Sequence, residues 1–176
     1  MHCLEVHRSL VAGSVVSAAI LALALGSAAA IAAPVPAAST TEFQVPVTFL
    51  SACGVGFRCY LPTLAAVTPS ATTNAPGAVS FAATPPTTIS ITWLDCIDVT
   101  VNWRNLTTGA TGATEIRRVP PDYSRPTAPG EWCRYNPTTV VTGSGTVAAT
   151  ADVAAAASRT GDHRPISSGV GLFQVP

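Results

Sequence analysis

The chain has 176 residues, of which 10% are charged, and its nine arginines balance nine acidic residues to a net charge of zero. It contains no lysine. So few cations cannot supply the clustered positive charge that drives nucleic-acid binding, so we expect no nucleic-acid partner. A hydrophobic fraction of 48% excludes a chain that is disordered throughout.

The first 32 residues have the layout of a secretory signal peptide. Arg8 precedes an uncharged run from Ser9 to Ala33, whose apolar centre is followed by small residues. This order predicts a signal-peptide helix over residues 1–32, with cleavage before Ala33. The alternative is a retained membrane anchor, because the run is long enough to span a bilayer, although no basic stop-transfer flank follows it. After cleavage we expect a secreted, extracellular or cell-envelope protein without stable membrane insertion.

Four cysteines remain in the mature chain: Cys53, Cys59, Cys96 and Cys133. An even number of cysteines in an exported chain predicts two disulfides, and three pairings are open. We favour Cys53–Cys59, which closes a small glycine-containing loop, together with Cys96–Cys133, which ties a long proline-rich loop to a hairpin. A metal site is the alternative, but no C-x-x-C pair is present and histidine is scarce, so we expect neither metal nor cofactor.

The mature chain is rich in Thr, Val, Ala and Pro, a composition typical of strands punctuated by turns. We expect a short flexible segment over residues 33–42, followed by one all-β domain over residues 43–176. The expected strands, in chain order, are 43–50, 78–82, 88–93, 99–104, 113–119, 138–142, 146–153 and 170–175. About eight short strands separated by Gly and Pro signals predict a sandwich or a barrel.

The clearest strand pattern lies between Thr87 and Arg104. Apolar residues alternate with polar ones over 88–93 and again over 99–104, so each segment has one apolar face. If the two segments form a hairpin, both apolar faces must point to one core. That condition requires opposed residues whose numbers have an even sum, such as Trp93 and Val99, and an odd-numbered loop of three or five residues.

Three segments resemble known modules. Residues 69–81, with Pro76-Gly77 before a strand, look like the start of the second strand of bacterial immunoglobulin-like modules. Residues 99–112 (VTVNWRNLTTGATG) and 169–176 (GVGLFQVP) resemble small exported β-sandwich proteins of actinobacteria, a group of uncharacterised function. The resemblance implies an immunoglobulin-like antiparallel β-sandwich of about seven or eight strands, and it carries no catalytic residue across.

Few residues offer catalytic chemistry. His163 is the only histidine of the mature chain, so a serine triad would need it together with a serine such as Ser144, which lacks the flanks of a nucleophile elbow. Asp95 and Asp98 flank Cys96, but calcium needs six to eight oxygens and turn aspartates usually accept local backbone amides. Asn105 begins a glycosylation sequon, which matters only in a eukaryotic host.

The segment over residues 119–137 is the best candidate for an interaction surface. It combines five prolines with aromatic and arginine residues of the kind that anchor interfaces, namely Tyr123, Arg125, Trp132, Arg134 and Tyr135. Loops of this length are often functional, and proline lowers the entropy that binding costs. The alternative is that Trp132 and Tyr135 pack over one end of the sandwich beside Cys133.

These patterns predict a non-enzymatic binding or structural module whose partner is an envelope protein or a glycan. The first alternative is a secreted inhibitor or effector that presents the loop around Arg125 to a protein target. A small hydrolase that uses His163 is a further alternative.

Overall fold

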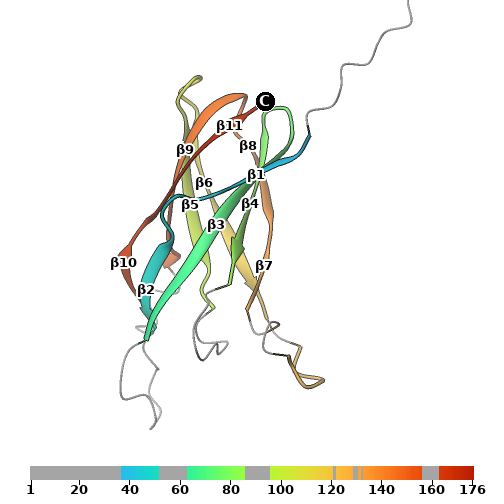
Figure 1. Ribbon diagram of the computed structural model, residues 1–176, viewed down its shortest axis with the longest axis vertical. Helices are drawn as coiled ribbons and strands as arrows, with labels where there is room; N and C mark the ends of the chain where they lie inside the picture. The colour runs from blue at the N-terminus through green and yellow to red at the C-terminus, as the bar shows by residue number, and fades with distance from the viewer. Residues whose placement is uncertain are drawn as a thin grey trace, which may run out of the picture. The chain divides into compact units, whose positions relative to one another are not determined.

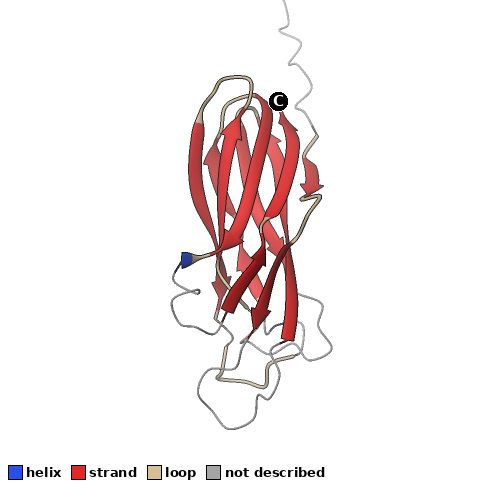
Figure 2. Ribbon diagram, turned by 90° about the vertical axis from the view of Figure 1, so that its left-hand side faces the viewer, coloured by secondary structure: helices blue, strands red, loops and turns tan. Residues whose placement is uncertain are grey.

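The computed structural model describes residues 37–51, 63–85, 96–120, 122–128, 131, 133–155 and 163–176. These residues form two antiparallel sheets that face each other as a sandwich (Figures 1 and 2). The first sheet has the order β10 (His163–Ser167), β2 (Val47–Ser51), β3 (Thr63–Ala75), β4 (Ala78–Thr84), β8 (Thr138–Val141), and β1 (Ser39–Glu42) also pairs with β3. The second sheet has the order β11 (Gly169–Val175), β9 (Gly145–Val153), β5 (Val99–Asn105), β6 (Thr111–Val119), β7 (Arg134–Asn136).

The core lies between the sheets and follows from the period-2 pattern of the strands. Alternate residues of β2, β9 and β11 are buried, as expected where one face of a strand meets a core. Phe81 is fully buried and makes edge-to-face contacts with Phe43 and Phe173, with ring centroids 6.4 Å and 5.9 Å apart. Such contacts add to the stabilisation that burial of the rings provides.

The chain between β1 and β2 crosses from one sheet to the other and back. After β1 the chain leaves β3, and Val45 forms an isolated bridge with Val170 of β11 before β2 returns to β3. Pro69 lies on β3 at this crossing, where its carbonyl accepts a hydrogen bond from the Phe43 N–H at 2.9 Å. The missing N–H of Pro69 faces the same gap, so proline interrupts no ladder bond there.

Glycine makes this crossing possible. A Cβ atom on Gly171 would lie 2.7 Å from the ring of Phe43, which therefore packs directly on the glycine backbone. The Gln44 side chain also accepts a hydrogen bond from the Leu172 N–H at 2.9 Å. Residues 43–45, which follow β1, thus cover the outer edge of β11, an edge that would otherwise invite pairing with another chain.

Asn105 joins the turns at the opposite end from β7. Its side chain is fully buried, and its amide nitrogen donates to the carbonyls of Thr142, Gly143 and Ser144 at 3.0, 3.1 and 3.0 Å. Its Oδ1 accepts from the N–H groups of the two threonines that follow Leu106, at 2.9 and 3.0 Å. The β5–β6 and β8–β9 turns are therefore held by a single side chain, and the asparagine of the glycosylation sequon is buried.

The all-β architecture and six of the expected strands are confirmed, whereas 43–50 is divided between β2 and the crossing segment. The expected 88–93 strand and the leader lie outside the described residues. The expected pairing of Trp93 with Val99 is wrong, because Val99 pairs with Ile116 on one side and Val153 on the other. Strands β3, β7 and β10 were not expected, and β1 occupies residues expected to be flexible.

Candidate functional site

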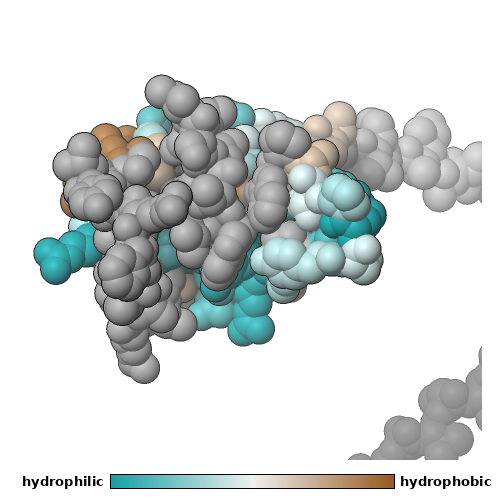
Figure 3. Space-filling view, turned by 90° about the horizontal axis from the view of Figure 1, so that it is seen from below, coloured by the Kyte–Doolittle hydropathy of each residue, from teal (hydrophilic) through white to brown (hydrophobic). Residues whose placement is uncertain are grey.

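The segment between β6 and β7 lies at the lower end of the sandwich in Figure 1. Of residues 120–133, the structure describes 120, 122–128, 131 and 133. Figure 3 views this end of the molecule, where much of the described surface in view is hydrophilic. We refer to residues 122–131 as the β6–β7 loop, within which positions 129 and 130 lie outside the described residues.

A local turn begins the β6–β7 loop. Oδ1 of Asp122 accepts hydrogen bonds from the Ser124 N–H at 3.0 Å and the Ser124 hydroxyl at 2.6 Å. This arrangement is an Asx turn, in which an aspartate satisfies the backbone two residues ahead. The same bonds, first from the hydroxyl and then from the N–H, hold the pKa of Asp122 below its usual value.

An ion pair closes the β6–β7 loop. The Arg125 guanidinium donates two hydrogen bonds to Glu131, from Nη1 to Oε2 at 2.9 Å and from Nη2 to Oε1 at 2.8 Å. Glu131 Oε2 also accepts from the Ala128 N–H at 3.2 Å, and the Ala128 carbonyl accepts from the Glu131 N–H at 2.9 Å. The bond from Arg125 is the main reason that the pKa of Glu131 falls to about 2, and the same pairing raises the pKa of Arg125.

These contacts divide the five residues proposed from sequence into different roles. Tyr123 lies between the two ends of the Asx turn and is 68% exposed. Arg125 is engaged with Glu131 inside the loop, whereas Arg134 is exposed at the start of β7 and lowers the pKa of Glu131 through its charge. Tyr135 packs against the hydrophobic core, and burial raises the pKa of its hydroxyl. Trp132 lies outside the described residues.

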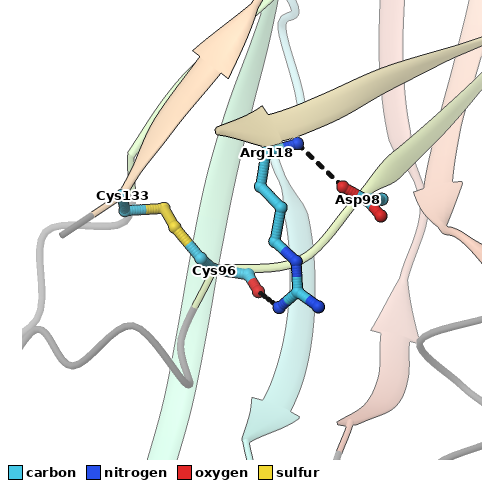
Figure 4. The surroundings of a disulfide bond; sticks show 4 residues. All are labelled: Cys96, Asp98, Arg118 and Cys133. Carbon is cyan, nitrogen blue, oxygen red and sulfur yellow. Dashed lines mark hydrogen bonds between the residues drawn. A yellow bond between two sulfur atoms is a disulfide. The ribbon is translucent and has the colours of Figure 1, made fainter. Parts of the chain in front are cut away.

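A disulfide fixes the far end of this segment. Cys96 and Cys133 are bonded, with their Cα atoms 5.4 Å apart, as one of the favoured pairings predicts. Arg118 of β6 supports the same corner, because its Nη1 donates to the Cys96 carbonyl at 2.8 Å and its backbone N–H donates to Asp98 Oδ1 at 2.7 Å (Figure 4). The segment that returns to β7 is therefore tied to the start of β5, while Cys53 and Cys59 lie outside the described residues.

The remaining candidate residues are far from this loop or from one another. Ser144 lies in the β8–β9 turn and donates to the Pro176 carbonyl at 2.7 Å. His163 begins β10, is 7% exposed, and lies edge-to-face with Phe49, with ring centroids 5.5 Å apart. Strand β9 runs between Ser144 and the chain that leads to His163, so the two side chains lie at opposite ends of the sandwich. Asp98 accepts the backbone N–H of Arg118 on β6, 20 residues further along the chain, rather than the local turn amide expected from the sequence, and Asp95 lies outside the described residues.

Among the described residues, no group of three or more His, Cys, Asp or Glu side chains is arranged to hold a metal ion. No helix within the same residues is long and apolar enough to cross a membrane. No family model, curated protein or solved structure matches the chain.

Proposed function

We propose that this chain is an exported, non-enzymatic binding module of the cell envelope or extracellular space, and that it captures a protein or glycan through the β6–β7 loop. The observation that carries the proposal is the display of Tyr123. This side chain is 68% exposed on a loop whose other polar groups are occupied by one another. Tyrosine is a frequent interface anchor because it offers a large, amphipathic surface with few rotatable bonds.

The bonding within the loop lowers the cost of binding. The Asx turn at Asp122 and the two-pronged bond between Arg125 and Glu131 already order the backbone around Tyr123. A partner therefore meets a surface that loses little conformational freedom on association. The disulfide at Cys133 limits the movement of the adjoining chain in the same way.

The sheet topology supports an immunoglobulin-like module. Strands β3, β4 and β8 are adjacent in the order of the A, B and E strands of such domains, and β11, β9, β5 and β6 in the order G, F, C and C′. In this correspondence Pro76-Gly77 precedes the second strand, as the sequence resemblance implies. Strands β1, β2 and β10 extend the sheet beyond the A strand.

The alternative of an inhibitor that inserts Arg125 into a target receives less support. Insertion would break the two bonds from Arg125 to Glu131 and leave a carboxylate without its cation. A hydrolase that used Ser144 as its nucleophile would need Ser144 and His163 together, although these residues lie at opposite ends of the sandwich. Export itself rests on the leader over residues 1–32 and the cysteine pattern. An intact mass that begins at Ala33 and rises by four protons on reduction would establish cleavage and two disulfides.

The proposal is tested by the binding of the labelled mature chain to actinobacterial cells. We compare the wild type with Tyr123→Ala and with Leu106→Ala, a control that alters an apolar residue, 55% exposed, at the opposite end of the sandwich. Loss of an anchor residue weakens binding by about tenfold or more, so Tyr123→Ala should show this loss and Leu106→Ala should not. Protease-treated cells distinguish a protein partner from a glycan. Equal binding by all three chains, or no saturable binding, would overturn the proposal.

A further inference from the structure

The outer face of the second sheet carries an ordered pattern of charge. Three rows of side chains cross the strands, as the pairing of β11, β9, β5 and β6 shows. The arginine row contains Leu172, Ala148, Arg104 and Thr111. The middle row contains Val170, Thr150, Asn102 and Ala113. The acidic row places Asp152 and Glu115 on either side of Thr100.

The middle of this face is low because its side chains are small. A shallow groove of about 660 Å³ runs over the middle row and the backbone between it and the arginine row. At one side of the groove Val170 and Leu172 are 44% and 52% exposed. An apolar, low-relief strip of this kind permits close approach of another flat surface.

The charged side chains on this face can still form further ion pairs. Arg104 forms no ion pair with any side chain in the part of the chain that the structure describes. Glu115 bonds to Arg117 through Oε2 alone, and Asp152 accepts the Ser168 hydroxyl through Oδ1. Each acid therefore keeps one carboxylate oxygen available on the same face as the unpaired arginine.

We propose that this face is the contact surface of a homodimer, in which Arg104 of each copy lies between Asp152 and Glu115 of the other. A two-fold axis that lies in the interface and follows the middle row exchanges the arginine row with the acidic row. An arginine and a carboxylate together bridge the roughly 10 Å that separates packed sheets. The axis also brings Val170 of the two copies together, so apolar and charged groups match in the same arrangement.

The charge of the whole chain favours a second copy as the occupant. The net charge is zero, and it stays zero without residues 1–32, which hold one arginine and one glutamate. Two copies therefore approach without net repulsion. Four strands and three rows give a footprint of roughly 19 Å by 20 Å, which is small for a stable dimer and predicts a weak, concentration-dependent association. Because the axis runs across the strands, the two β6–β7 loops point in opposite directions.

The test is sedimentation velocity of the oxidised mature chain from about 1 μM to about 500 μM, a range that brackets weak association. We expect the wild type to dimerise across this range, and Arg104→Glu and Glu115→Arg each to remain monomeric. An equimolar mixture of these two variants should form a heterodimer, because each contact then joins opposite charges again. Arg164→Glu makes the same charge change on exposed β10 of the other sheet and should dimerise like the wild type.

The outcomes that overturn the proposal are separate from those of the loop experiment. A wild type that stays monomeric at every concentration overturns it, as does a dimer that survives Arg104→Glu or a mixture that fails to associate. Peptidoglycan fragments or chito-oligosaccharides that shift the amide resonances of Asn102 and Thr150 in a monomeric wild type would assign the face to a glycan instead. Circular dichroism of each variant shows that the fold is retained.

Discussion

Replacement of Asn105 by alanine tests a buried side chain that makes five hydrogen bonds to the backbone. The side chain is fully buried and bonds to three carbonyls and two N–H groups. The two N–H groups belong to exposed residues, Thr107 and Thr108, so water replaces that contact in the variant. Of the three carbonyls in the β8–β9 turn, that of Thr142 belongs to a residue that is 2% exposed and that of Gly143 to a half-buried residue, so water reaches both poorly, whereas Ser144 is exposed and its carbonyl bonds to water in the variant.

The magnitude follows from the contacts to the carbonyls of Thr142 and Gly143, which water does not replace. At about 1 kcal/mol for each lost bond, Asn105→Ala should lower the free energy of unfolding by about 2 kcal/mol. Urea denaturation at low micromolar concentration measures this change. Asn102→Ala is a matched control, because it removes an exposed asparagine from the same strand and should change stability by less than about 0.5 kcal/mol. A loss below about 1 kcal/mol in Asn105→Ala would refute the role of this side chain as the link between turns.

The isosteric variant Asn105→Asp sharpens the test. It keeps the acceptor for Thr107 and Thr108 but places a carboxylate oxygen against three carbonyl oxygens. Folding therefore favours the protonated carboxyl and raises its pKa above the unfolded value. The deficit relative to the wild type should grow as pH rises through that raised pKa and shrink at acid pH, which parallel urea titrations at pH 4 and pH 7 would show.

Three further predictions concern the loop, the crossing strand and the disulfide. Glu131 should titrate near 2 in an NMR titration of its carboxyl carbon, and Arg125→Ala should return the pKa towards 4.5. The contribution of Glu131 to the free energy of unfolding is present above its unfolded pKa and is lost as pH falls towards 2. A normal titration in the wild type would contradict the ion pair. Gly171→Ala should lower stability by about 1–3 kcal/mol, because its Cβ would lie 2.7 Å from the ring of Phe43, and a neutral result in urea would show that the ring moves aside. Cys133→Ser should cost about 4 kcal/mol, since the disulfide spans 37 residues, and an unchanged thermal midpoint would show that the unfolded chain is not constrained by it.

Local sequence periodicity predicts a strand when one of its faces is buried and the other is exposed. The alternation in β5 and β9 is visible in the sequence because each strand buries one face, and burial repeats every second residue. By contrast, β3 contains Pro69, which argues against a strand when only local rules are applied. The structure explains why proline is tolerated there, because the chain that follows β1 leaves β3 at Pro69 and no ladder bond needs its missing N–H.

The candidate site shows the same division. Composition alone singled out the segment at 119–137 and both of its tyrosines, of which the structure exposes Tyr123. It did not distinguish Tyr123 from Tyr135, which packs against the core, or reveal that Arg125 bonds to Glu131. Residue type and order determined the class of fold and the chemistry that is available. Only the tertiary structure decided which side chains meet, because strand pairing and loop closure bring together residues whose partners are distant in sequence.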